Sequence, residues 1–323
     1  MRLLRAVPGQ VWAWLRTLAG VGILALLVWR LGTGGFLAGL RAVDVPALGL
    51  AVAIGLVTTV GCAWRWCLVA RGMGIRLPLG EAVGDYYRSL FLNSALPGGI
   101  LGDVHRAVRH GQQVGSVGRG VRAVALERTA GQVVLVAVTF LVLLVKPFAL
   151  SRAVVLGILA VLVLALAAGA YAGRRHLPAL RRGLRHWPGV LLASSVALLG
   201  HLATFVLATR VAGSSAPVGS LLPMMLLALV VMGLPVNIGG WGPREGFVAW
   251  AFGVAGLGAT LGLTVAVVYG VLAFASSLPG AGVIAVRWVH ALRKAPRPAP
   301  RPLALSVPSP TRPLARQGGA VRG

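Results

Sequence analysis

The chain has very few acidic residues. Of its 323 residues, six are Asp or Glu against 31 Lys and Arg, and charged residues make up only 11% of the total. An ordinary soluble domain is excluded, because about a quarter of the residues of such a domain are charged. Hydrophobic residues make up 57% of the chain and its mean hydropathy is +0.85. This composition is typical of a protein that crosses a membrane several times.

Cysteine is almost absent, and the sequence lacks the patterns that hold metal ions. Cys62 and Cys67 lie in one apolar stretch, at a spacing that directs them to different faces of a helix. There is no CxxC motif, and the six histidines are scattered without ligand spacing. The sequence therefore predicts no disulfide, no metal site and no cofactor.

The net charge of +25 does not indicate a nucleic-acid partner. The basic residues lie in clusters between apolar stretches, and no base-stacking module accompanies them. Basic clusters of this kind mark cytoplasmic loops. No small-residue cleavage site follows the first apolar stretch, so we expect this stretch to remain as the first span. Both the N- and the C-terminus are then expected in the cytoplasm.

Six apolar stretches are long enough to cross a bilayer, which takes about 20 residues. They lie at residues 12–30, 46–68, 120–145, 151–172, 189–211 and 258–290. We expect an all-α, polytopic membrane domain over residues 11–292, after a short cytoplasmic N-terminus at 1–10. Residues 293–323 are rich in Pro and Arg and predict a disordered cytoplasmic tail. The sequence Trp64-Arg65-Trp66 suits an anchor at the membrane interface, where the second span ends.

Two Pro- and Gly-rich segments, Asn93 to Arg106 and Leu234 to Gly246, interrupt apolar stretches and resemble each other. Each has a Leu-Pro, a Gly-Gly pair, a third Gly, and then an acid and an arginine. The residues that break the helices are Pro97, Gly98, Gly99, Gly102, Pro235, Gly239, Gly240 and Gly242. At membrane depth, non-helical backbone is tolerated only where it is buried in protein or lines an aqueous cavity. Each segment therefore predicts a re-entrant hairpin of two half-helices.

The charges between the two segments predict that they enter the membrane from opposite faces. With the N-terminus inside, the first enters from the cytoplasmic face and the second, counted along the spans, from the outer face. The unit of span, hairpin and span then occurs twice, at about residues 46–145 and 189–290, with opposite topology. Inverted repeats of this kind place the substrate site near the midplane, between the broken helices.

Charged residues in and beside the breaks are the candidate substrate-binding residues: Asp103, Arg106, Glu127, Arg128, Arg244 and Glu245. Asp103 suits either the N-cap of a half-helix or an ion pair with Arg106, three residues later. An ionisable residue inside a span, such as Glu127, is costly unless it is paired. Arg106 or Arg244 could be its partner; alternatively, Glu127 lies near the cytoplasmic surface and is hydrated.

Arg244 carries the stronger functional signal of the second break. A cation at a helix N-terminus is disfavoured by the helix dipole, whereas Glu245 is stabilised there. The arginine makes sense if an anion binds to its side chain and to the free backbone N–H groups together. This chemistry favours binding and moving an anion over transforming it, and no catalytic residue is assigned.

These motifs resemble those of the lysylphosphatidylglycerol synthase transmembrane-region family of bacterial and archaeal membrane proteins. The resemblance rests on the two breaks and on Glu127-Arg128, where the family pattern leads us to expect Asp-Arg, and covers about residues 12–290. In two-part members, this region is implicated in moving an aminoacylated phospholipid between leaflets, and a separate cytoplasmic domain makes that lipid. Residues 293–323 are too few for such a domain. The resemblance therefore implies the translocation half.

The leading interpretation is a flippase-like lipid translocase of the bacterial cell membrane, acting on a phospholipid or a lipid-linked anionic headgroup, rather than an enzyme. One alternative is an integral membrane transferase that uses a lipid-linked aminoacyl or glycosyl donor, with Asp103 or Glu127 as general base. The other is a non-catalytic partner subunit whose breaks only permit tight packing. The expected partners are membrane phospholipid and either a second copy of the chain or a separate lipid-modifying enzyme.

Overall fold

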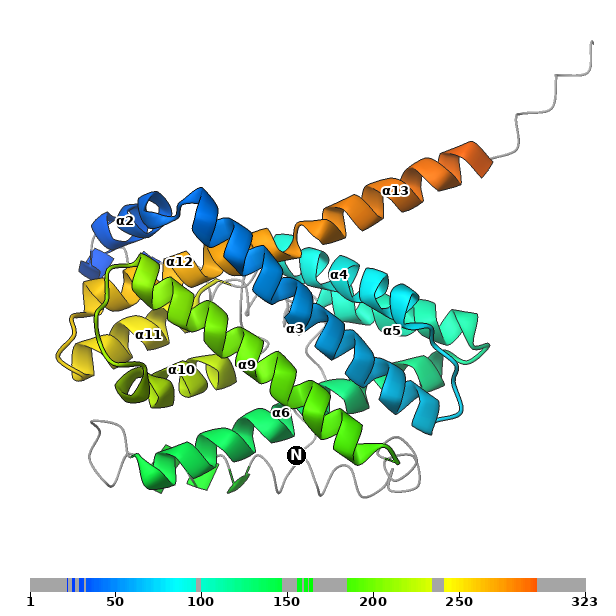
Figure 1. Ribbon diagram of the computed structural model, residues 1–323, viewed down its shortest axis with the longest axis horizontal. Coiled ribbons are helices and arrows are strands. Elements are labelled where there is room, and N and C mark those ends of the chain that lie inside the picture. Colours follow the sequence, from blue (N-terminus) through cyan, green and yellow to red (C-terminus); the bar gives the residue numbers. More distant parts are fainter. Residues whose placement is uncertain are drawn as a thin grey trace, which may run out of the picture. The chain divides into compact units, whose positions relative to one another are not determined.

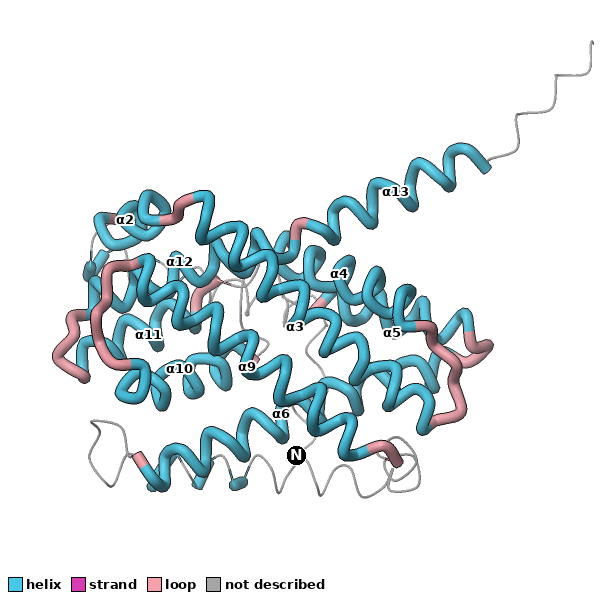
Figure 2. Tube along the Cα trace, in the orientation of Figure 1, coloured by secondary structure: helices cyan, strands magenta, loops and turns pink. Residues whose placement is uncertain are grey.

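The computed structural model describes residues 33–96, 100–146, 185–233 and 241–294, with a few residues between 22 and 31 and between 156 and 164. The elements in these ranges are helices (Figures 1 and 2). They are α2 (Gly34–Ala42), α3 (Val45–Gly72), α4 (Leu79–Ala95), α5 (Leu101–Gln113), α6 (Val117–Val145), α9 (Trp187–Val211), α10 (Val218–Met232), α11 (Pro243–Val254), α12 (Ala259–Ser277) and α13 (Pro279–Lys294). The chain up to Ala285 forms one compact unit and Val286–Gly323 form a second. The candidate site lies wholly in the first unit.

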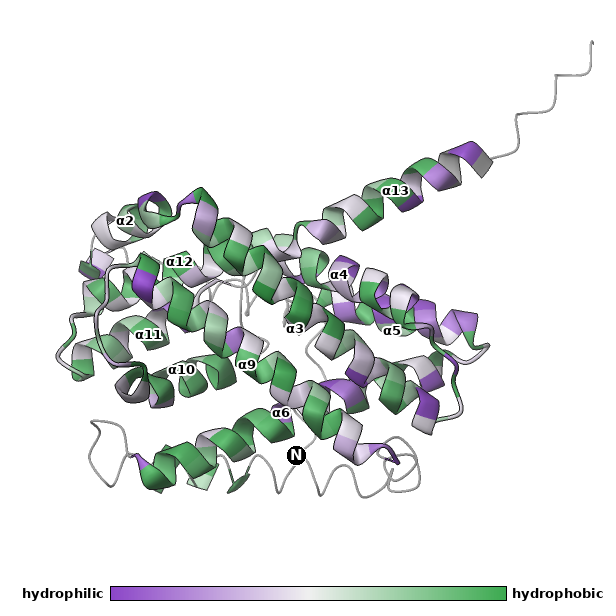
Figure 3. Ribbon diagram, viewed as in Figure 1, coloured by the Kyte–Doolittle hydropathy of each residue, from purple (hydrophilic) through white to green (hydrophobic). Residues whose placement is uncertain are grey.

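Four described helical stretches are long and apolar enough to cross a membrane: Val45–Gly72, Val117–Val145, Trp187–Val211 and Ala259–His290. They confirm four of the predicted spans, and the protein is an all-α membrane protein. Hydrophobic residues extend along α3, α6 and α9 in Figure 3, while hydrophilic residues gather around α5. The last stretch is interrupted at Leu278, because Pro279 lacks a backbone N–H and begins a new helix. The predicted spans at 12–30 and 151–172 and the predicted tail lie largely outside the described residues.

Each predicted hairpin is bounded by a pair of short helices. α4 and α5 flank the first break, and α10 and α11 flank the second. The tips themselves, with Pro97, Gly98, Gly99, Pro235, Gly239 and Gly240, lie outside the described residues, so their path remains a prediction. Gly242 precedes α11 with a φ of +119°, a conformation that residues with a side chain rarely adopt. A Cβ on Gly102 would overlap the Ser89 backbone, so glycine there lets α5 lie close against α4.

The principal helix contacts repeat between the two halves of the chain. α3 packs on α4, α4 on α5 and α5 on α6, just as α9 packs on α10, α10 on α11 and α11 on α12. There are also contacts between the halves. In one direction α6 contacts α9 and α10, and in the corresponding way α12 contacts α3 and α4. The counterparts α3 and α9 pack against each other and run in opposite directions (Figure 1). This pattern is expected of two units with opposite topology, and on this basis we propose the repeat at about 46–145 and 189–290.

Glycine lets α5 and α6 approach to backbone contact. A Cβ on Gly120 would overlap the backbone of Gly111 and the carbonyl oxygen of Ala107 across the helix pair. Small residues commonly mediate such contacts in membranes, where lipid provides no hydrophobic driving force for helix association. Arg106 lies next to Ala107 on α5, and Glu127 lies on α6. The close crossing of these helices therefore fixes the position of the Arg106 side chain relative to that of Glu127.

We expect Gly120→Ala to lower the free energy of unfolding by about 1–3 kcal/mol, because the added methyl group forces two backbones apart. Thermal unfolding of the purified protein in detergent measures the effect. Gly118→Ala is the matched control: a Cβ there approaches only the end of the Arg122 side chain. An equal loss of stability in both variants would show that the α5–α6 contact is not responsible.

The proposed opposite topology can be tested by labelling cysteines introduced at the two tips. In a chain whose Cys62 and Cys67 are replaced by Ala, we expect Gly98→Cys to react with a membrane-impermeant thiol reagent from the cytoplasmic side. Gly240→Cys should react from the outer side. Reaction of both positions from one side only would contradict the inverted arrangement.

Candidate functional site

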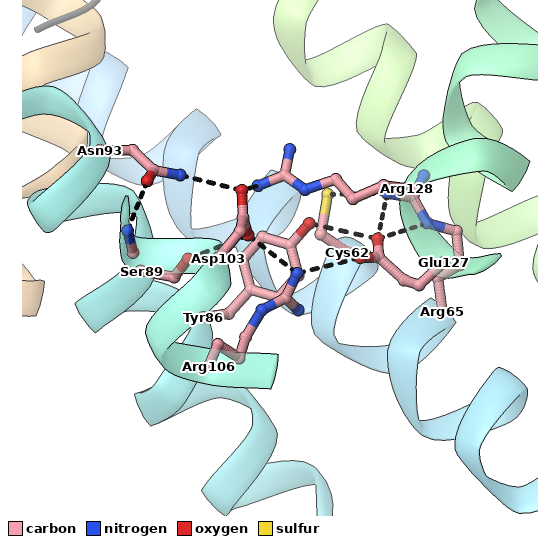
Figure 4. A network of polar contacts seen from close by, with 10 residues as sticks. Cys62, Arg65, Tyr86, Ser89, Asn93, Asp103, Arg106, Glu127 and Arg128 are labelled. Carbon is pink, nitrogen blue, oxygen red and sulfur yellow. Dashed lines mark hydrogen bonds and ion pairs between the residues drawn. The ribbon is translucent and has the colours of Figure 1, made fainter. Parts of the chain in front are cut away.

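Glu127 lies at the centre of a buried network of charges (Figure 4). Its Oε1 accepts a hydrogen bond from Arg65 Nε at 2.9 Å, and Arg65 Nη2 pairs with the same oxygen. The Tyr86 hydroxyl also donates to Oε1, at 3.2 Å. Oε2 accepts from Arg106 Nη2 at 3.1 Å. The expected pairing with Arg106 is confirmed, and Glu127 is enclosed by protein rather than hydrated at a surface.

Asp103 forms the second centre of the network. Its carboxylate accepts hydrogen bonds from Ser89 Oγ, Asn93 Nδ2 and Arg106 Nη2, each at 3.0 Å. Arg128 Nη2 donates to it at 2.6 Å. The pair with Arg106 is confirmed, whereas the N-cap interpretation is wrong, because Asp103 lies inside the first turn of α5 and no side chain caps that helix.

Asp103 bonds to uncharged groups as well as to the two arginines. Its bonds to Ser89 and Asn93 join the end of α4 to the start of α5, and Asn93 Oδ1 also accepts from the Gly102 N–H at 2.8 Å. The charges and the backbone break are thus parts of one arrangement.

Arg65 belongs to the site, although the sequence analysis placed it at the membrane interface. The prediction of an interface anchor is wrong, because α3 continues to Gly72 and the Arg65 side chain is buried against Glu127. Arg106 lies between two rings, 4.5 Å from the Trp66 centroid and 4.2 Å from that of Tyr86. Glu127 was identified because it is a charged residue within an unbroken apolar stretch. The same signal could have revealed Arg65.

A cavity of about 240 Å³ adjoins the network. Its walls come from α3, α4, α6, α9 and α10, and it extends to Gly233, the last described residue before the second break. Arg65 and Arg128 line it. Its other polar lining residues are Thr58, Thr59, Cys62, Tyr86, Gln132, Ser194 and His201. The cavity is therefore bordered both by the charges near the first break and by the edge of the second break.

An apolar groove lies on another face of α3. It has a volume of about 460 Å³ and contains almost no polar surface. The lining residues are Leu56, Val57, Val60, Gly61, Trp64, Leu79 and Val196. α3 thus presents hydroxyl and charged groups to the cavity and hydrocarbon to the groove.

Arg244 and Glu245 form a separate pair at the second break. Arg244 Nε donates to Glu245 Oε1 at 2.9 Å, and Glu245 Oε2 accepts from the Gly242 N–H at 2.6 Å. Both side chains are buried, and Arg244 lies 5.5 Å from the Trp241 ring centroid and 5.0 Å from that of Tyr269. The counter-ion of Arg244 is therefore its neighbour Glu245, so no external anion is needed to neutralise it.

The two groups of charges are connected through uncharged residues. The Tyr269 hydroxyl lies 3.4 Å from His201 Nδ1, and His201 lines the cavity. Of the six predicted site residues, Asp103, Arg106, Glu127 and Arg128 share one network, while Arg244 and Glu245 form the other. Of the two partners expected for Glu127, only Arg106 is found among the described contacts. In the described part of the chain, no group of His, Cys, Asp and Glu residues is placed to hold a metal ion.

A charged network enclosed by apolar helices, beside a polar cavity, defines a multi-pass helical membrane protein with an internal polar site. Residues 14–280 match the family described as Lysylphosphatidylglycerol synthase TM region, and the chain belongs to this family. The suspected resemblance is confirmed, and the family description associates the chain with membrane lipids. No curated protein matches the chain.

We expect Glu127→Gln to destabilise the protein by about 3–5 kcal/mol, because it leaves Arg65 and Arg106 buried with one carboxylate fewer. The change should appear as a lower unfolding temperature in detergent. Glu81→Gln, at an exposed position of α4, should stay within about 0.5 kcal/mol of the natural protein. If the two variants unfolded at the same temperature, the central place given to Glu127 would be wrong.

Proposed function

We propose that the chain moves a phospholipid, or a lipid carrying an anionic headgroup, between the leaflets of the bacterial cell membrane, with both of its ends in the cytoplasm. The observation that carries the proposal is the position of Arg128. Its side chain is 40% exposed, lines the cavity and keeps Asp103 as its partner. A guanidinium group in this setting suits a phosphate, because its planar set of donors matches phosphate oxygens.

The engagement of the carboxylates supports transport over group transfer. A general base must be free to accept a proton from the reacting group. Glu127 accepts hydrogen bonds from two arginines and a tyrosine, and Asp103 accepts from two arginines, a serine and an asparagine. Both candidate bases of the transferase alternative are therefore already occupied, so we prefer translocation.

The cavity lined by Arg65 and Arg128 suits a lipid headgroup, and apolar surface such as the groove lined by Val57, Val60 and Trp64 suits acyl chains. Burying a headgroup phosphate without partners would be costly. The arginines offset that cost while hydrocarbon chains stay in contact with hydrocarbon.

In liposomes that contain the purified protein, labelled phospholipid should exchange between leaflets, and Arg128→Gln should slow the exchange by about tenfold or more. A hydrogen bond to a charged group contributes about 1.5–3 kcal/mol, which corresponds to that range. Arg122→Gln is the control, because Arg122 is exposed on the same helix and donates to the Gly118 carbonyl. Turnover of an aminoacyl or glycosyl donor in detergent, without any leaflet exchange in liposomes, would favour the transferase instead.

A further inference from the structure

We infer that His201 is a proton-binding site in the wall of the cavity, and that a proton binds there together with the phosphate of the cargo. Transport by the protein is then linked to protons. The inference deepens the proposed function and rests on it, because it names a second ligand of the same cavity. It concerns only the phosphate of a headgroup and holds whatever groups are attached to that phosphate.

His201 lies near the middle of a membrane span. It comes 14 residues after the first residue of α9 and 10 residues before the last. A Cβ on the neighbouring Gly200 would overlap Thr58 Oγ1, and Thr58 is itself central in α3, 13 residues after the start of that helix. Both helices therefore place His201 at mid-depth. Ionisable residues are rare at this depth, and those that occur commonly belong to proton or ion pathways.

The imidazole of His201 is accessible from the cavity. The residue is exposed and lines the same space as Arg128. Its Nδ1 lies 3.4 Å from the Tyr269 hydroxyl, and no hydrogen bond to Nε2 is found in the described part of the chain. Histidine is the side chain that ordinarily gains or loses a proton between about pH 5 and pH 8. His201 is therefore a titratable group at the centre of the proposed pathway.

The titratable groups around His201 come from several helices. α9 packs on α3, α6, α12 and α10, and α10 contains no titratable residue. The titratable side chains that line the cavity with His201 or adjoin it are Cys62, Arg65, Tyr86, Glu127, Arg128 and Tyr269. A thiol and a phenol are ordinarily uncharged at neutral pH. Glu127 is enclosed behind the arginines, so the charges that share the cavity lining with His201 are the two positive charges of Arg65 and Arg128.

These positive charges link the binding of a proton to the binding of a phosphate. The guanidinium groups of Arg65 and Arg128 disfavour a further positive charge at His201. A phosphate that binds to Arg128 offsets this repulsion. A protonated imidazole in turn offers the phosphate oxygens a positive charge and a charge-assisted hydrogen bond. Each ligand therefore raises the affinity for the other, and the two effects are equal because linkage is reciprocal.

The proton also acts at the junction between the two groups of charges. When the neutral imidazole carries its hydrogen on Nε2, Nδ1 accepts a hydrogen bond from the Tyr269 hydroxyl. In the protonated form both ring nitrogens donate, so the hydroxyl must accept instead. The Tyr269 ring lies 5.0 Å from the Arg244 guanidinium of the second break. Protonation of His201 therefore changes a contact that joins the cavity to the second half of the protein.

Leaflet exchange in liposomes of phosphatidylcholine, measured with the same pH on both sides, tests the inference. Labelled phosphatidylglycerol at a low mole fraction is the probe, because its phosphodiester does not titrate in this pH range and exchange then depends on affinity. We expect exchange at about pH 5.5 to be about tenfold faster than at about pH 8. One added hydrogen bond to a charged group corresponds to a change of that size.

Two histidine variants separate the proposed site from other titrating groups. His201→Asn keeps an amide near the position of Nδ1 but does not titrate, so exchange should proceed at the same rate at both pH values. His186→Gln is the matched control, because His186 directly precedes α9 and is not among the residues that line the cavity. It should keep the full pH dependence. Unfolding temperatures are measured for both variants, and His201→Gln replaces His201→Asn if the latter does not fold.

Uptake of protons on binding is a second readout, and it does not depend on transport. The heat of binding of dihexanoyl phosphatidylglycerol to the purified protein is measured near neutral pH in two buffers that differ in ionisation enthalpy. We expect a net uptake of up to about one proton for each lipid bound. His201→Asn should bind the lipid without taking up protons, whereas His186→Gln should behave as the natural protein does.

The possible outcomes separate the inference from the proposed function. Exchange that is independent of pH in the natural protein would overturn the inference and leave translocation standing. The same pH dependence in His201→Asn as in the natural protein would also overturn it, and so would lipid binding without proton uptake. Proton uptake that requires His201, in a protein that exchanges no lipid between leaflets, would overturn the proposed function and support the proton site.

Discussion

The arrangement of the first half of the protein depends on one buried carboxylate. Glu127 pairs with an arginine from α3 and an arginine from α5 while itself lying on α6, so three helices are joined at a single carboxylate. None of these groups could remain ionised in an apolar bundle alone. The longer side chain of Glu, compared with the Asp expected from the family pattern, is consistent with a carboxylate that spans the gap between Arg65 and Arg106.

The second half repeats the helix arrangement but not the charge. Glu127 lies ten residues after the start of α6 at Val117, and Tyr269 lies ten residues after the start of α12 at Ala259. Where Glu127 meets Arg106 with a carboxylate, Tyr269 meets Arg244 with the face of its ring. Arg244 instead has its own counter-ion in Glu245. The two halves are therefore alike in architecture, while the buried network of three arginines and two carboxylates belongs to the first half.

Sequence reasoning found four of the spans, the short helices beside the two breaks and the Asp103–Arg106 pair, because each depends on local spacing. It misplaced Arg65, because whether an arginine near the end of an apolar stretch is hydrated or buried depends on which helices pack around it. It also assigned an external anion to Arg244, because a cation at a helix N-terminus is disfavoured by the helix dipole. In the first turn of α11, Glu245 turns back to the Gly242 N–H and meets Arg244 there. The cavity could not be predicted, because its walls come from distant parts of the chain.

The position of α3, as a wall with the polar cavity on one side and the apolar groove on the other, has a consequence for tolerance to changes in the membrane. A lipid handled in the proposed way is recognised by its headgroup, while its chains stay outside the selective space. Cells that alter the length or unsaturation of their fatty acids when the temperature changes would then keep the same transport specificity. Recognition of the cargo would then not depend on the composition of its acyl chains.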